Sequence, residues 1–215
     1  MAYIGNKPAN KAIVASDLDP AVITGQTALA VAPADTDEFL ISDAGTLKRL
    51  DASLIGGGKI NQVVSTNKTD TFSESINTEA FSSIVTGLTV NITPSASSSK
   101  ILVFVNMVVG ANGEHATAVQ LFRDSTQIDL ADASSSRARF SKGRVFNYGG
   151  TGANATLSLN FLDSPSSTSQ ITYGVKIGHT SSSAKTLYVN RSHDDSDDAS
   201  YGRGTSTITA IEVLA

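Results

Sequence analysis

Side chains capable of metal or acid–base chemistry gather at one place near the C-terminus. This acidic run consists of His193, Asp194, Asp195, Asp197 and Asp198. Hard oxygen ligands at this density could hold Ca²⁺, but the run does not match an EF-hand loop, because no glycine stands at the sixth position and no glutamate at the twelfth. Arg191 and Arg203 flank the run and could neutralise part of its charge. We therefore expect a solvated loop that needs no metal.

A second group of charged side chains is basic. Arg137, Arg139, Lys142 and Arg144 lie within eight residues of one another. Such a cluster could meet anionic sugars on a surface. The alternation of Arg137, Arg139 and Ser141 also suits the wet face of an edge strand, where charge discourages pairing with another sheet. We favour this second interpretation.

Other signatures of catalysis are missing from the sequence. His115, His179 and His193 are isolated from one another, lack the spacing of a metalloenzyme and are expected to be exposed loop residues. There is no cysteine and no Gly-x-Ser-x-Gly elbow, and the glycines at 56–58 lack the spacing of a phosphate-binding loop. We therefore expect no enzymatic activity and no cofactor.

Composition argues against two further classes of protein. The net charge is −4 at pH 7 and no basic stripe is present, so the chain is not expected to bind nucleic acid. The longest apolar run, from Ile101 to Val109, is far shorter than a membrane span and is interrupted by Asn106. We therefore expect no membrane insertion.

From residue 59 onward the sequence is typical of strands. Short alternating segments, such as Leu88 to Ile92 and Leu157 to Phe161, suit strands with one buried face. Ile101 to Val105 is apolar on both faces, which predicts a central strand covered on both sides. About nine or ten such segments are joined by polar loops without a helical crossover. The sequence therefore predicts an all-β head over residues 59–215, an antiparallel β-sandwich of the jelly-roll type.

Residues 1–58 form a smaller segment of different character. Asp19 to Ile23 suits a capped helical turn. Glu38 to Ser42 and Thr46 to Leu50 flank a short turn and predict a β-hairpin. The three glycines at 56–58 then predict a flexible joint before the head.

Two sets of apolar residues lack an evident cover within the chain. The hairpin is amphipathic, and an isolated hairpin is marginal in water. It could pack on the chain's own head or on other copies of the chain. In the strand that begins at Ile101, one apolar row can fill the sandwich core while the other needs a cover. We predict an interface between copies that contains Phe39, Ile41, Leu47, Leu50, Leu102, Phe104 and Val108.

Several stretches resemble structural proteins of bacteriophages. The opening Met-Ala-Tyr-Ile-Gly-Asn-Lys-Pro resembles the start of tail-fibre and related proteins, and residues 34–49 are similar to a short module that recurs in them. Residues 62–72 and 85–94 also look phage-like. The head resembles the trimeric jelly rolls of the tumour-necrosis-factor and complement-head type. The resemblance covers nearly the whole chain, but it rests on sequence texture and not on a catalytic motif.

The resemblance implies a structural component of a virion, a short homotrimeric tail fibre exposed on the particle surface. Residues 1–58 would dock on the tail or on another fibre protein, and the head would contact a host glycan or receptor. The acidic run, together with Arg137, Arg139 and Arg144, then supplies the candidates for host contact. The alternatives are a capsid decoration or cement protein and a free carbohydrate-binding module. The absence of Trp and the small number of Tyr disfavour the last of these.

Overall fold

The computed structural model contains two compact units, Met1–Gly56 and Gly57–Ala215, which we call the N-terminal unit and the head. The structure describes residues 24–25, 27, 31, 33–34, 36–44, 46–55, 59–112, 116–146 and 154–215. The helical turn expected at Asp19 to Ile23 and the joint expected at residues 56–58 lie outside the described residues. Among the residues described, no helix is long and apolar enough to cross a membrane.

The N-terminal unit contains the hairpin that the sequence predicts. Strand β1 (Glu38–Asp43) pairs antiparallel with β2 (Thr46–Asp51). A single turn of 3-10 helix follows at Ala52–Leu54.

The pairing register divides the predicted apolar residues of the hairpin between its two faces. Phe39 pairs with Leu50, so these two residues share a face with Ile41. Position 47 pairs with Ser42 and belongs to the opposite face. The register therefore separates position 47 from residues 39, 41 and 50, because positions 47 and 50 are an odd number of residues apart and strand faces alternate.

The head is all-β, as the sequence predicts. Its alternating apolar segments correspond to strands, whereas β4 and β9 were not expected, since their few apolar residues are mixed with serine, glutamate, glycine and arginine. The strands are β3 (Ile60–Lys68), β4 (Phe72–Ile76), β5 (Thr89–Ile92), β6 (Lys100–Ala111), β7 (Ala116–Arg123), β8 (Thr126–Ile128), β9 (Lys142–Phe146), β10 (Ala155–Asp163), β11 (Ile171–His179), β12 (Lys185–Val189) and β13 (Ser206–Val213).

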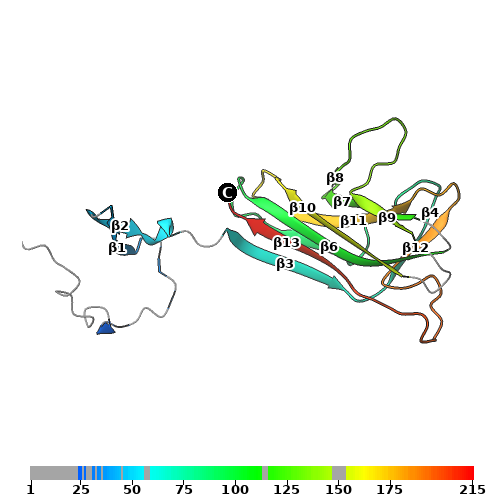
Figure 1. The fold of residues 1–215 in the computed structure, drawn as a ribbon, viewed down its shortest axis with the longest axis horizontal. Helices are drawn as coiled ribbons and strands as arrows, with labels where there is room; N and C mark the ends of the chain where they lie inside the picture. Colours follow the sequence, from blue (N-terminus) through cyan, green and yellow to red (C-terminus); the bar gives the residue numbers. More distant parts are fainter. Residues whose placement is uncertain are drawn as a thin grey trace, which may run out of the picture. The chain divides into compact units, whose positions relative to one another are not determined.

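Eight of these strands pair in a nested order. Strand β3 pairs with β13, β5 with β11, β6 with β10 and β7 with β9, always antiparallel. The first and third pairs belong to one sheet, which β12 and β4 extend, and the second and fourth pairs belong to the other, which also holds β8 (Figure 1). A long antiparallel ribbon folded over in this way is a jelly roll. The predicted fold class is thereby confirmed.

The two sheets pack face to face through alternate residues of their strands. In β6 the odd-numbered positions from Ile101 to Val109 are completely or almost completely buried. The even-numbered positions differ: Leu102 is half-buried and Phe104 is 42% exposed. The expected cover of the outer face is therefore not supplied at Phe104 by the described part of this chain.

The head has two distinct ends. Lys59 Nζ donates a hydrogen bond to the Ala215 carbonyl at 2.8 Å, so the head begins and finishes at one end, which we call proximal. Strand β6 starts at this end, where Lys100 pairs with Val213. It finishes with Ala111 at the opposite, distal end, where the segment between β12 and β13 also lies (Figure 1). The 12 residues of β6 correspond to about 36 Å of extended chain.

A buried carboxylate joins three parts of the chain at the proximal end. Glu212 is completely buried. Its Oε2 accepts hydrogen bonds from Asn61 Nδ2 at 2.9 Å and Gln62 Nε2 at 2.7 Å. Its Oε1 accepts from the backbone N–H and the hydroxyl of Ser95, at 2.6 and 2.7 Å. Burial raises the pKa of Glu212, but these hydrogen bonds outweigh burial and hold that pKa well below its ordinary value.

A second buried carboxylate links the two sheets. Asp163 of β10 accepts two hydrogen bonds from Arg123 Nη1 of β7, at 2.9 and 3.0 Å. It also accepts one from the hydroxyl of Tyr173 of β11, at 2.7 Å. Burial and this hydrogen bond raise the pKa of Tyr173 well above its ordinary value. The phenol therefore stays protonated and donates to Asp163.

Candidate functional site

The acidic loop, residues 191–205, is fastened to the sandwich at both ends. Asn190 precedes it, is completely buried and has a positive φ of 65°. Its Nδ2 donates hydrogen bonds to the carbonyls of Lys68 at 2.8 Å and Asp70 at 2.9 Å. Its Oδ1 accepts from the hydroxyl of Ser206, which follows the loop, at 2.5 Å. The same hydroxyl accepts from the N–H of Val108 at 3.1 Å. Both ends of the loop are thus held against β3 and β6.

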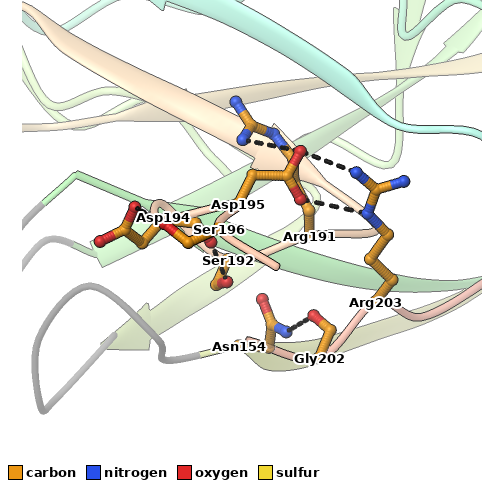
Figure 2. A network of polar contacts seen from close by, with 8 residues as sticks. All are labelled: Asn154, Arg191, Ser192, Asp194, Asp195, Ser196, Gly202 and Arg203. Carbon is orange, nitrogen blue, oxygen red and sulfur yellow. Dashed lines mark hydrogen bonds and ion pairs between the residues drawn. The ribbon is translucent and has the colours of Figure 1, made fainter. Parts of the chain in front are cut away.

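Within the loop one carboxylate is shared by two arginines (Figure 2). Asp195 accepts hydrogen bonds from Arg203 Nε at 3.1 Å and Arg203 Nη2 at 2.8 Å, and Arg191 Nη1 lies 3.4 Å from Asp195 Oδ2. Arg191 and Arg203 also form an antiparallel bridge through their backbones. The predicted compensation of charge by these two arginines is confirmed. The ion pairs of Asp195 with these arginines stabilise the head only modestly, since the Arg203 side chain is 63% exposed.

His193 belongs to the base of the loop and not to an exposed surface. Its ring lies edge-on to Tyr188 of β12, with centroids 5.7 Å apart, while Arg191 stacks over the same tyrosine at 4.3 Å. His193 is half-buried, and its Nδ1 is buried without a hydrogen bond in the described part of the chain. The expectation of an exposed loop histidine was therefore wrong here, because the ring packs beside Tyr188.

The remaining acids of the run differ in their partners. Asp194 accepts a hydrogen bond from Ser196 at 3.2 Å (Figure 2). Asp198 accepts one from the N–H of Ser200 at 2.8 Å, which lowers the pKa of Asp198. Asp197 has no side-chain partner among the described residues. In the described part of the chain, no three His, Cys, Asp or Glu residues are placed to hold a metal ion.

The tip of the acidic loop forms a hollow of about 390 Å³ that is open to solvent. Tyr201 contributes to it, and sequence reasoning did not single out this residue. Its position two residues before Arg203, inside a polar loop, could have identified Tyr201 as a candidate. The hollow is lined by Asp195, Ser196, Asp197, Asp198, Tyr201 and Arg203.

The first two basic residues, Arg137 and Arg139, do not lie in a strand. Residues 129–141 lack regular secondary structure, and β9 begins only at Lys142. The side chain of Arg139 is half-buried and donates from Nε to the Ala131 carbonyl at 2.6 Å, so it ties its own loop together. Arg137 is exposed, and the side chain of Arg144 lies outside the description. The edge-strand interpretation was therefore wrong for Arg137 and Arg139, because these residues precede the strand.

Of the other two histidines, only His179 belongs to the described residues. His115 lies outside the described residues. His179 is 1% exposed, and its two ring nitrogens bond the Ile76 carbonyl and the Ser181 N–H, each at 3.1 Å. The prediction of an exposed loop residue was wrong for His179, because it is the last residue of the buried strand β11.

The predicted interface residues of the head lie on the outer face of the first sheet. Cross-strand pairing aligns four apolar side chains in one row, in the order Val63, Ile211, Leu102 and Leu162. Phe104 lies two positions from Leu102 on the same face. We call these five residues the apolar face.

Val108 does not belong to the apolar face. It is half-buried, and a Cβ placed at Gly204 would lie 2.7 Å from its Cγ2. The acidic loop of the same chain therefore passes directly over Val108. The loop that returns across the distal end of β6 therefore covers part of Val108, for which a neighbouring copy was expected.

Comparisons with known proteins find similarity in structure alone. No family model and no curated protein sequence matches the chain. Solved structures of infectious bursal disease virus are similar: its VP2 subviral particle at 14% identity, its T13 particle at 13% and its Gx strain at 13%. These matches cover 84%, 80% and 80% of this chain but only 43%, 39% and 40% of the viral chains, with TM-scores of 0.35, 0.37 and 0.35. At these values the jelly-roll assignment rests on the nested strand pairing and not on the similarity.

Proposed function

We propose that this chain is a structural protein of a virion. It assembles as a homotrimer, holds other virion proteins through its N-terminal unit and presents the distal end of the head outward. It has no enzymatic role. The proposal is supported by the phage-like stretches of the sequence and by the jelly-roll head, and the single observation that carries it is the apolar face.

The apolar face leaves large side chains in water on a single chain. Val63 is 59% exposed, Leu162 46% and Phe104 42%. Full burial of such a side chain contributes roughly 1.5–3 kcal/mol, so covering the exposed halves of several at once favours association. Contiguous apolar patches of this kind are typical of interaction sites. A neighbouring copy of the head is the cover that the trimeric resemblance implies.

The N-terminal unit also exposes large apolar side chains. Val31, Leu40 and Leu54 are each about 70% exposed, at 72%, 73% and 68%. Burying this many apolar groups requires a partner, since a two-stranded hairpin has no second layer. We assign these side chains to docking on another virion protein.

Two positions in the particle suit such a protein. The phage-like N-terminus favours a short tail fibre whose distal loops contact the host surface. A capsid decoration protein with the same jelly roll is the alternative. Electron microscopy of particles labelled with an antibody against the head distinguishes the two, because label on the tail supports the fibre and label on the capsid shell supports decoration.

Sedimentation of the full-length protein tests the trimer. We expect a single species of three times the chain mass at micromolar concentration. Phe104→Asp should dissociate it, because burying an unpaired charge is costly. Asn106→Asp, two positions along the same strand and face, is the control and should leave the trimer intact. A monodisperse wild-type monomer would refute the stoichiometry and the fibre built on it.

A further inference from the structure

We propose that the hollow of the acidic loop binds a neutral hexopyranose, the terminal sugar of a surface glycan. This inference rests on the proposed function, in which the distal end of the head faces outward, and it names the class of ligand. The hollow is open to solvent. The segment between β12 and β13 that forms it lies at the distal end, opposite the end where β3 begins (Figure 1).

The lining offers the complementary groups that a sugar ring needs. Asp197 has no side-chain partner in the described part of the chain, so both of its carboxylate oxygens are available to accept from hydroxyls. Arg203 donates from Nε and Nη2 to Asp195, so its Nη1 remains able to donate to a sugar hydroxyl. Tyr201 is half-buried and its hydroxyl has no partner among the described residues. A pyranose presents neighbouring hydroxyls to the charged groups and an apolar C–H face to the tyrosine ring.

The charge of the lining favours a neutral sugar over an acidic one. Three carboxylates and one guanidinium line the hollow, which gives a formal charge of −2. Arg191 also touches Asp195 and reduces the local charge to −1. The lowered pKa of Asp198 keeps that carboxylate ionised. A sialic acid or a phosphorylated sugar would meet like charge, whereas a neutral hydroxyl pair would find charged acceptors.

The size and stiffness of the hollow suit a single sugar ring. Its volume of about 390 Å³ is near the lower end of the roughly 300–1,000 Å³ typical of small-molecule sites. The hydrogen bonds of Asn190 and Ser206 hold both ends of the loop, and the Asp195–Arg203 pair fixes one wall. A preformed wall lowers the entropic cost of binding.

Binding of monosaccharides to the full-length protein tests the inference. Saturation-transfer NMR and titration would use the methyl glycosides of glucose, galactose and mannose, with 3′-sialyllactose and putrescine as counter-probes. We expect at least one neutral glycoside to bind and the sialoside to bind more weakly. Asp197→Asn and Tyr201→Ala should each weaken binding by about tenfold or more, the effect of losing a charged hydrogen bond or a ring contact. Asp132→Asn, an exposed acid on another loop, should leave binding unchanged.

Three results would overturn the inference. These are no binding of any neutral glycoside, binding that both variants leave intact, and binding of putrescine alone, which would make the hollow a simple cation site. Because Asp197 is exposed and has no partner among the described residues, Asp197→Asn should melt at the wild-type temperature and so report on binding alone. Sedimentation of the same samples separates the two proposals: a trimer that binds no sugar contradicts only the site, and a monomer that binds sugar contradicts only the trimer.

Discussion

Replacing Glu212 by glutamine should destabilise the head by more than the removal of one charge suggests, because hydrogen bonds to the carboxylate are lost as well. The carboxylate accepts four hydrogen bonds, two on each oxygen. A glutamine has the same shape but only one acceptor oxygen, so its NH₂ must face either Ser95 or the amides of Asn61 and Gln62. The amide of Gln62 is not free to turn, since its Nε2 also donates to the Thr93 carbonyl at 2.7 Å.

The size of the effect follows from the donors left without an acceptor. Two hydrogen bonds to a buried charged group are lost, each worth about 1.5–3 kcal/mol, part of which the remaining contacts recover. We therefore expect Glu212→Gln to lower the free energy of unfolding by about 2–4 kcal/mol at pH 7. Glu79→Gln is the control, because Glu79 is exposed and should change stability by less than about 0.5 kcal/mol.

The pH dependence of this difference gives a second test. The pKa of Glu212 is lower in the folded chain than its ordinary value of 4.5. The stabilisation is therefore complete above about pH 5 and is lost as the pH falls below the unfolded value. Urea unfolding followed by circular dichroism at pH 7 and pH 4, at one protein concentration, should show a smaller gap between wild type and Glu212→Gln at pH 4. An equal or larger gap at pH 4 would refute the assignment of a buried, hydrogen-bonded carboxylate.

Three further predictions concern other parts of the chain. Tyr173→Phe should lower the free energy of unfolding in urea by about 1–2 kcal/mol, since it removes a hydrogen bond to Asp163. Tyr201→Phe removes a hydroxyl that has no partner among the described residues and should change stability very little; equal losses would contradict the Asp163 network. Ca²⁺ should not raise the melting temperature of the full-length protein relative to chelator, because Arg191 and Arg203 already compensate Asp195; a rise of several degrees would reveal a metal site. Residues 59–215 should melt cooperatively without the N-terminal unit, and a molten or aggregated product would contradict this domain boundary.

The fold was largely predictable because it depends on local alternation. Segments such as Leu88 to Ile92 carry a period of two, and a run of them without helices leads to an antiparallel sandwich. Strand β9 escaped prediction because a glycine and an arginine interrupt its pattern. The histidine at 179 was misjudged for a related reason: its neighbours are small and polar, and nothing local shows that Ile76 and Ser181 provide partners for both ring nitrogens.

The candidate site was only partly predictable. Charge compensation at Asp195 follows from arginines nearby in the sequence, and it was anticipated. The anchoring of the loop depends on Asn190 reaching the backbone of residues 68 and 70, more than a hundred residues away, which no local pattern reveals. The cover that Gly204 places over Val108 is equally non-local. Sequence patterns therefore identified the loop but not which of its residues face inward.

The apolar face also depends on contacts between distant parts of the sequence. Its position on the sheet restricts what can cover it. Val63, Ile211, Leu102 and Leu162 come from four strands, so the row exists only once β3, β13, β6 and β10 are paired. Towards the distal end the next rows become polar, through residues such as Thr209 and Asn160 beside Phe104 and then Asn67, Thr207, Asn106 and Ser158. The cover must therefore fit the proximal half of the sheet and leave the distal loops free. A neighbouring head arranged around a common axis would meet both conditions. Sedimentation of residues 59–215 tests this cover: a persisting trimer supports the neighbouring head, and a monomer shows that the heads alone do not hold the trimer.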